Sequence, residues 1–234
     1  MDRPLEIVDL QLEPMLLRQG LEARYDVSET RYKIGAGYFK VLEVADGYAL
    51  LDDAEEAKIP YWAEVWPSSL ALAAALQSVS MAEKKCLELG AGLGLGSCVA
   101  AGLGGEVITS DYLVEPLAFA KVNASLNQVQ IEPRLLDWTK PLQSAESFDI
   151  ILAADVLYSK VNIEPVARTL IELLQAGGLA LLSDPQRNHL PSFLNLMSDY
   201  GASNRRVERE VELGGRKVLV DVYTFSLSPK ALRL

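Results

Sequence analysis

The segment Cys86-Leu-Glu-Leu-Gly-Ala-Gly-Leu-Gly-Leu-Gly96 decides the fold class of this 234-residue chain. It begins as a short apolar strand that ends on Glu88, and it continues into a turn with glycines at positions 90, 92, 94 and 96. The next run, Ser97-Cys-Val-Ala-Ala101, has helical character, so the turn directs helix N-terminal amides at any ligand that lies there. A strand, a glycine-rich turn and a helix in this order are typical of a nucleotide site in an open α/β sheet.

The spacing of the glycines separates several kinds of nucleotide site. A dinucleotide fingerprint requires G-x-G-x-x-G or a final Ala, but the sixth position is Leu95 counted from Gly90 and Ser97 counted from Gly92. A Walker-type phosphate loop requires Gly-Lys-Ser/Thr, which does not follow here. The pattern that remains is an acidic residue, Glu88, two positions before G-x-G-x-G.

Asp111 supplies a second signal because it ends the next predicted strand, Glu106-Val-Ile-Thr-Ser110. It lies 21 residues after Gly90, near the offset of roughly 20 residues at which an acidic side chain meets the ribose of a nucleotide. A carboxylate accepts two hydrogen bonds from the vicinal hydroxyls of a ribose. We therefore favour ribose binding over the structural alternative, a helix cap.

Two further clusters follow later strands. Asp137-Trp138 offers a carboxylate for the exocyclic amine of an adenine and an aromatic plane for its ring, but a Trp packed on a strand end is an equal interpretation. The apolar run 148–154 is followed by Asp155 and Tyr158 at the carboxyl edge of the sheet, where open α/β sheets place their chemistry. The structural alternatives are a helix cap for Asp155 and a core position for Tyr158.

From residue 84 onward, strands and helices alternate, which predicts a parallel sheet covered by helices. We expect strands near 85–89, 106–110, 132–136, 148–153 and 178–183, and helices near 94–103, 114–127, 160–175 and 189–200. The β-rich segments 205–213 and 217–227, joined by Gly214-Gly215, predict a terminal hairpin.

The first quarter of the chain lacks the alternation of strands and helices that begins at residue 84. Short β-like runs at 31–34, 38–44 and 48–51, with the hairpin signal Asp46-Gly47, predict a small β-rich extension over residues 1–59, ahead of a main domain over 60–234. Residues 1–24 receive no assignment. The acidic segment 52–56 is expected to be a solvated loop rather than a metal site.

An aromatic segment, Pro60-Tyr-Trp-Ala-Glu-Val-Trp-Pro67, precedes a helix rich in Ala and Leu. Pro67 suits the first turn of that helix. The aromatic residues either close the helix entrance as a hydrophobic staple or form a wall over a ligand, and the sequence favours neither interpretation.

Composition excludes several classes of function. The net charge of −10 argues against a broad DNA- or RNA-binding surface, which needs an excess of Lys and Arg. One His and two Cys form no zinc ligand set, so we expect no metal. The N-terminus has no apolar leader and no run reaches the ~18 apolar residues of a membrane span, so we expect a cytoplasmic protein with no membrane contact.

Taken together, the motif Glu88-x-Gly90-x-Gly92-x-Gly94, the ribose acid Asp111 and the β-rich tail resemble the class I S-adenosylmethionine-dependent methyltransferases. The resemblance covers roughly residues 60–227. It implies an α/β fold with a Rossmann-like seven-stranded sheet, mostly parallel, with a C-terminal antiparallel hairpin and helices on both faces.

A narrower resemblance is to the family 16 protein-lysine methyltransferases, including those that act on the electron-transfer flavoprotein β subunit. It rests on Trp66-Pro67-Ser68, Asp137-Trp138 and Ala154-Asp155-Val-Leu-Tyr158. The similarity to the flavoprotein-directed enzymes rests on Pro60-Tyr-Trp-Ala63 with Trp66-Pro67. By this resemblance Asp155 and Tyr158 face the methyl acceptor. The residues it assigns to the S-adenosyl-L-methionine site are Trp66, Glu88, Gly90, Ala91, Gly92, Gly94, Asp111, Tyr112, Asp137, Trp138 and Ala154.

The resemblance implies methyl transfer to a lysine side chain of a protein substrate. The Asn-Pro-Pro-Tyr/Phe sequence of adenine- and glutamine-methylating enzymes is absent after the strand that ends near residue 154, which weakens those acceptors. A small amine or metabolite remains an alternative acceptor. A non-catalytic cofactor-binding scaffold is disfavoured because Asp155-x-x-Tyr158 is intact.

Overall fold

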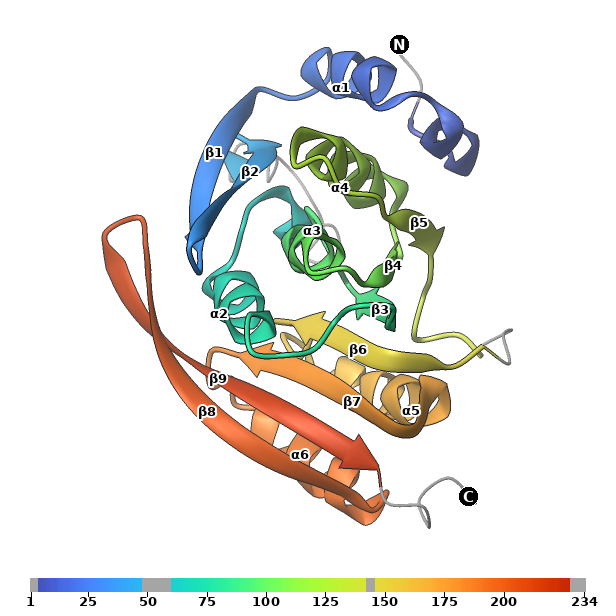
Figure 1. Ribbon diagram of the computed structural model, residues 1–234, viewed down its shortest axis with the longest axis vertical. Helices are drawn as coiled ribbons and strands as arrows, with labels where there is room; N and C mark the ends of the chain where they lie inside the picture. The colour runs from blue at the N-terminus through green and yellow to red at the C-terminus, as the bar shows by residue number, and fades with distance from the viewer. Residues whose placement is uncertain (1–3, 48–59, 142–145, 228–234) are drawn as a thin grey trace.

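The computed structural model describes residues 4–47, 60–141 and 146–227, and its centre is a seven-stranded sheet with the order β5-β4-β3-β6-β7-β9-β8 (Figure 1). Strands β3 to β7 are parallel, whereas β9 is antiparallel to both of its neighbours, β7 and β8. The strands are β3 (Lys85–Leu89), β4 (Glu106–Asp111), β5 (Glu132–Leu135), β6 (Phe148–Ala154), β7 (Leu174–Asp184), β8 (Ala202–Leu213) and β9 (Arg216–Leu227). This sheet confirms the predicted fold class.

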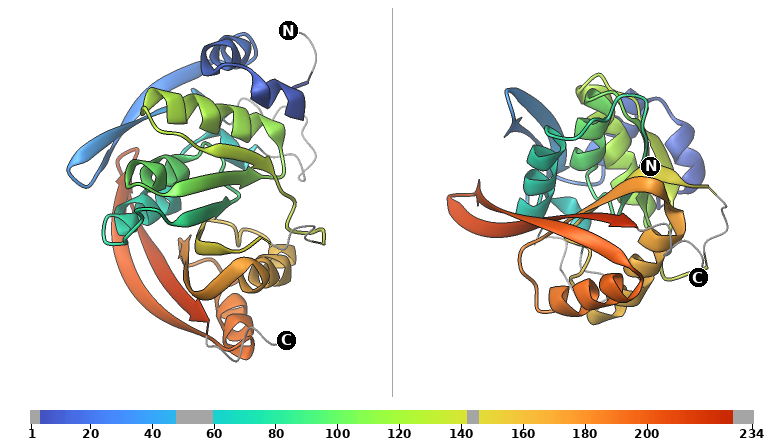
Figure 2. Two further views of the ribbon diagram at one scale, coloured as in Figure 1. Left: turned by 45° about the vertical axis from the view of Figure 1, so that its right-hand side comes forward. Right: turned by 60° about the horizontal axis from the view of Figure 1, so that its bottom comes forward.

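Helices cover both faces of the sheet (Figure 2). One face carries α2 (Pro67–Leu76), α3 (Leu95–Gly102) and α4 (Val114–Leu126), and the other carries α5 (Ile163–Leu173) and α6 (Leu190–Asp199). The parallel strands are therefore buried on both sides, which explains why they read as continuous apolar runs. In β3, for example, Cys86 packs into one buried cluster and Leu87 into the other.

The N-terminal segment packs on the outside of α4. It consists of the short 3-10 helix η1 (Ile7–Gln11), helix α1 (Pro14–Glu22) and a separate antiparallel hairpin of β1 (Val27–Ile34) and β2 (Gly37–Val44). The predicted runs 31–34 and 38–44 lie in this hairpin, but its turn is at Gly35-Ala36 rather than at Asp46-Gly47. The predicted run 48–51 and the acidic segment 52–56 lie outside the described residues.

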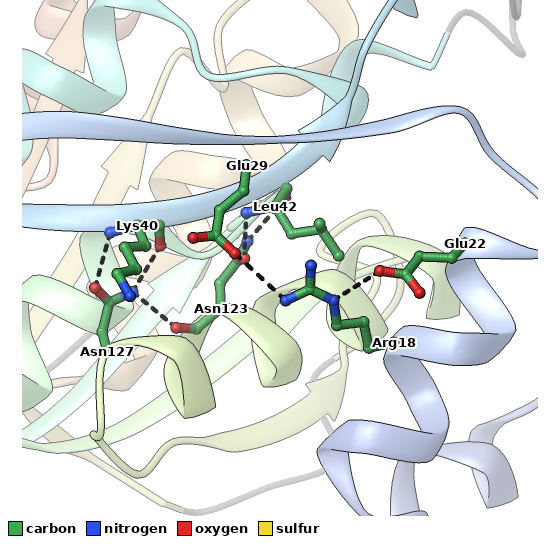
Figure 3. Close-up of polar contacts among 7 residues, drawn as sticks. All are labelled: Arg18, Glu22, Glu29, Lys40, Leu42, Asn123 and Asn127. Atoms are coloured by element: carbon green, nitrogen blue, oxygen red, sulfur yellow. Dashed lines mark hydrogen bonds and ion pairs between the residues drawn. The ribbon is translucent and has the colours of Figure 1, made fainter.

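Side chains of α4 and of the residue that caps its end bind the edge of β2 (Figure 3). Asn123 accepts a hydrogen bond from the backbone N–H of Leu42 at 2.7 Å and donates to the carbonyl of Leu42 at 3.2 Å. Asn127, one helical turn later, forms the same pair of bonds with Lys40 at 2.9 and 2.7 Å. The two amides thus take the place of a third strand and attach the hairpin to the main sheet's helical layer.

The start of β7 and the unassigned lead segment are two places where the structure differs from the sequence prediction. Strand β7 begins at Leu174, not near 178, because Leu174 is buried and pairs with Phe148 before a register shift leads into the main pairing. The unassigned lead segment contains α1, in which Pro14 takes the first helical position and Leu17 and Leu21 face the core. Among the described helices, none is long and apolar enough to cross a membrane.

Candidate active site

A pocket opens at the carboxyl edge of the sheet and brings together ten of the thirteen residues that the sequence assigns to a site. These ten are Trp66, Gly90, Ala91, Gly92, Asp111, Tyr112, Trp138, Ala154, Asp155 and Tyr158. They come from the ends of β3, β4 and β6, the loops that follow β5 and β6, and the residue that precedes α2. In a parallel sheet the carboxyl ends of neighbouring strands share one edge, so residues far apart in sequence meet there.

The glycine-rich loop after β3 forms the floor of the pocket. Gly90 has a φ of +59°, and a methyl group on its Cα would lie 2.9 Å from the Trp138 ring. Only glycine satisfies both conditions without displacing that ring. The N–H of Ala91 donates to the carbonyl of Ser110 at 2.9 Å and ties the loop to the end of β4. The loop therefore presents bare backbone to the pocket.

Glu88 lies behind the loop rather than in the pocket. Its buried Oε2 accepts hydrogen bonds from the backbone N–H of Ser97 at 2.7 Å and from the Ser97 hydroxyl. Ser97 is in the first turn of α3, so the carboxylate pairs an N–H that has no partner within the helix. A methyl group on Gly96 would lie 2.2 Å from the other carboxylate oxygen, so a larger residue there would displace the Glu88 carboxylate. Burial raises the pKa of Glu88 to about 7, against the opposing effect of the Ser97 hydrogen bonds.

Asp111 lines the pocket at the end of β4. Its Oδ2 accepts from the N–H of Gly92 and its Oδ1 from the N–H of Leu113, both at 3.2 Å. Burial raises the pKa of this carboxyl to about 6, although the backbone hydrogen bonds act in the opposite direction. Ligand hydroxyls that donate to Asp111 would favour its ionised form and offset that burial.

The aromatic segment before α2 packs against the core and also lines the pocket. The ring of Trp62 packs in the core, 5.5 Å from Phe119 between ring centres, but Trp62 also lines the pocket. Trp66 donates its indole N–H to the carbonyl of Tyr61 at 2.6 Å, and the Tyr61 ring lies 5.5 Å from that of Tyr158. Tyr61, Trp62, Trp66 and Tyr158 thus form an aromatic wall of the pocket.

Trp138 likewise combines two roles. Its ring is 6% exposed and belongs to the buried cluster beneath α5 and α6, but it also lines the pocket next to Gly90. The guanidinium of Arg168, on α5, donates to the Trp138 carbonyl at 3.0 Å. Trp138 can therefore pack in the core and still present part of its ring to the pocket.

Asp155 follows β6 in a left-handed conformation, with a φ of +59°. Its N–H donates to the carbonyl of Ser183 on β7 at 2.9 Å, and its Oδ1 forms an ion pair with the Nε of Arg187 at 2.5 Å. Arg187 itself lines the pocket. Tyr158 is 40% exposed at the same site, and burial raises its pKa.

Three predicted residues do not line the pocket. Glu88 lies behind the loop as described, and Gly94 is the residue before α3, where a methyl group would lie 2.6 Å from Ala120. Asp137 lines a neighbouring hollow instead, and its carboxylate binds Thr139 and the ammonium of Lys140. Glu88 and Gly94 thus shape the loop from outside the cavity.

The structure also adds lining residues that sequence reasoning did not assign. They are Tyr61, Trp62, Glu64, Val65, Ser69, Leu93, Leu95, Val156 and Arg187. The first two lie in the aromatic segment that the sequence does single out. Arg187 carries no local motif, but it follows β7 at the same edge that places Asp155 after β6. Within the described ranges, no group of three or more His, Cys, Asp or Glu side chains is arranged to hold a metal ion.

Comparison with known proteins matches residues 51–200 to the family described as lysine methyltransferase. The chain belongs to this family. The family expectation from the sequence motifs is therefore confirmed.

Two relatives show how far the similarity extends. Protein N-lysine methyltransferase METTL21A from Xenopus tropicalis is 33% identical over 147 residues, which are 58% of this chain and 66% of the relative. Protein-lysine methyltransferase METTL21E from Mus musculus is 38% identical over 140 residues, which are 54% of this chain and 57% of the relative. The chain thus spans between about half and two thirds of the length of these relatives.

Among solved structures, the N-methyltransferase NodS from Bradyrhizobium japonicum WM9, in complex with S-adenosyl-L-homocysteine, has a TM-score of 0.55 at 16% sequence identity. The superposition covers 76% of this chain and 97% of NodS. At this identity the likeness establishes the shared fold and nothing further.

Proposed function

We propose that this chain transfers a methyl group from S-adenosyl-L-methionine to the side-chain amine of a lysine in a protein substrate. The observation that carries the proposal is the single pocket in which Gly90, Gly92 and Asp111 meet Asp155 and Tyr158. Membership of the lysine methyltransferase family and relatives named as protein N-lysine methyltransferases support a lysine acceptor.

The residues around the glycine-rich loop fit the donor. Gly90, Ala91 and Gly92 leave room for a nucleoside against the backbone, and Asp111 offers carboxylate oxygens to the ribose hydroxyls. Trp66, Tyr112, Trp138 and Ala154 provide apolar and aromatic surface around them. Glu88 and Gly94 act indirectly, by fixing the loop. A contact between Asp137 and the adenine amine stays a prediction.

Asp155 and Tyr158 are the groups we assign to the acceptor. The bound donor supplies an activated methyl group on a sulfonium, so the task of the chain is to align the acceptor nitrogen with it. A lysine ammonium has no lone pair and must lose a proton before it reacts. Asp155 orients the nitrogen, while the neighbouring rings of Tyr158 and Tyr61 offer aromatic surface to the lysine side chain.

Labelled S-adenosyl-L-methionine and a proteome extract test this function. We expect label in protein with the natural chain and a loss of about 100-fold or more with Asp155→Ala. An unchanged rate and unchanged acceptor binding in Asp155→Ala would overturn the role of this residue. Label in small molecules alone would indicate a metabolite acceptor, and binding of S-adenosylhomocysteine without any transfer would indicate a scaffold.

A further inference from the structure

Arg187 lines the pocket, but the proposed binding of donor and acceptor gives it no role. Its Nε lies 2.5 Å from Oδ1 of Asp155, the carboxylate that we assign to the acceptor nitrogen. The Asp155 side chain is 9% exposed and that of Arg187 is 33% exposed. The pair is therefore largely shielded from water, where an ion pair has more effect than on an open surface.

The backbone holds both members of this pair. Asp155 is fixed in its left-handed conformation by the bond from its N–H to the Ser183 carbonyl. The N–H of Arg187 donates to Oδ1 of Asp184 at 2.6 Å. The two residues follow neighbouring strands, β6 and β7, so the pairing is set by the sheet rather than by a mobile surface side chain.

A carboxylate on its own would oppose the reaction at this position. An anion next to a lysine side chain favours the ammonium and raises the pKa of the amine, which is ordinarily about 10.4. Methyl transfer needs the neutral amine: the nitrogen lone pair forms the N–C bond, the C–S electron pair stays on sulfur, and one N–H proton passes to water. A fixed guanidinium beside the carboxylate cancels much of the effect of the anion.

We propose that Arg187 is a positioning residue of the acceptor site: it neutralises Asp155 through Oδ1 and leaves Oδ2 to orient the acceptor nitrogen as an uncharged amine. The inference rests on the proposed function and deepens it. In this account Arg187 lowers the pKa of the acceptor amine by neutralising Asp155. Asp155 then orients the amine and does not bind it as a cation.

Other charged or titratable groups near the pair define the background of any pH measurement. Asp184 and Asp221 lie opposite one another on β7 and β9, and burial raises the pKa of Asp184 to about 6. The remaining groups are Tyr61, Glu64, Asp111, Tyr112 and Tyr158 in the pocket and Arg206, which forms an ion pair with Asp221. Asp184 titrates at lower pH than a lysine amine, so its ionisation is separable from that of the acceptor.

The test is the pH dependence of kcat at saturating protein acceptor, because kcat reports the ionisation of groups in the enzyme–substrate complex. We expect Arg187→Gln to move the rising limb to higher pH by about one unit, with activity recovering at alkaline pH, because the acceptor amine is then harder to deprotonate. Arg187→Lys, which keeps the charge, should retain most of the natural profile. Arg205→Gln, which changes an exposed arginine on β8, is the matched control.

Thermal melting and S-adenosylhomocysteine affinity, measured on each variant, report folding and the donor site separately. A uniform loss at every pH, equal in Arg187→Gln and Arg187→Lys, would show a merely structural role and overturn the inference. Superimposable profiles of Arg187→Gln and the natural chain would overturn it as well. If the natural chain transfers no label to lysine, the proposed function fails, and this inference fails with it.

Discussion

Asp111 and Glu88 are both buried carboxyls beside the glycine-rich loop, but they contact different partners. Asp111 lines the pocket and accepts from loop amides, whereas Glu88 accepts from the first turn of α3 and does not reach the cavity. A sequence motif cannot distinguish the two roles, because both residues simply lie at or near the end of a strand. We therefore expect only Asp111 to respond directly to the donor.

Binding of S-adenosylhomocysteine should weaken by about fourfold between pH 7.5 and pH 5.5, because the Asp111 carboxyl, with a pKa of about 6, becomes protonated over this range. The ionised form is the one that accepts both ribose hydroxyls. Asp111→Asn should bind more weakly at both pH values and lose most of the pH dependence. Calorimetric titration measures this, and an Asp111→Asn variant with the natural affinity and pH profile would remove Asp111 from the donor site.

At the residue scale, the sequence predicts best those side chains that end a strand or directly follow one. Gly90, Asp111 and Asp155 could be placed because parallel strands share one carboxyl edge. Arg187 could not, because its role depends on an ion pair with a residue 32 positions away. Asp137 follows a strand too, but its short-range contacts with Thr139 and Lys140 turn its carboxylate toward its own loop.

At the scale of elements, the buried Glu88 carboxyl at the start of α3 makes the stability of the fold depend on pH. Glu88 is fully buried, and its pKa of about 7 lies above the ordinary value of 4.5. The folded state therefore holds this proton more tightly than the unfolded state, and the resulting stability is lost as pH rises through about 7. The same sign applies to Asp111 and Asp184, whose pKa values burial raises to about 6.

Glu88→Gln should remove this contribution. We expect the free energy of unfolding to fall by about 2 kcal/mol less between pH 5 and pH 8 in the variant than in the natural chain. Urea denaturation at the two pH values measures the difference. Glu106→Gln, at an exposed position at the start of β4, is the control, and an identical pH dependence of Glu88→Gln and the natural chain would contradict this account.

The N-terminal hairpin depends on one fully buried amide. Asn123 exchanges two hydrogen bonds with Leu42 and donates a third to the carbonyl of Leu93 at 2.9 Å. Asn123→Ala leaves these backbone groups unpaired, and we expect it to lower the free energy of unfolding by about 2–4 kcal/mol. Arg18→Ala, which removes partly exposed ion pairs with Glu22 and Glu29, should cost less than about 1 kcal/mol. Equal effects of the two substitutions in denaturant titrations would show that Asn123 does not anchor the hairpin.

Elements with a clear hydrophobic pattern and clear residues that begin or end them could be predicted closely. The predicted strand 85–89 and helix 114–127 match β3 and α4 within one residue. The start of β7 could not be predicted, because Leu174-Gln-Ala176 continues the helical pattern and only pairing with β6 makes Leu174 extended. Helix α1 does have sequence signals, namely Pro14 in its first turn and the spacing of Leu17 and Leu21. The helix is too short for this apolar pattern to repeat often enough to be predicted.

At the scale of the whole molecule, the sheet order places the two halves of the pocket on adjacent strands. Gly90, Gly92 and Asp111, which we assign to the donor, lie at the ends of β3 and β4, and Asp155, which we assign to the acceptor, follows β6. Strand β6 is the direct neighbour of β3 in the order β4-β3-β6-β7. The N-terminal hairpin packs against α4 (Figure 1). The division into an extension over 1–59 and a domain over 60–234 stays a prediction.

The most direct measurement is the position of the transferred methyl group. Protein acceptors labelled by the natural chain from labelled S-adenosyl-L-methionine are digested and sequenced by tandem mass spectrometry. We predict a methyl group on the Nζ of lysine in a small number of proteins, absent when Asp155→Ala replaces the natural chain. Label confined to another side chain, to nucleic acid or to small molecules would contradict the account.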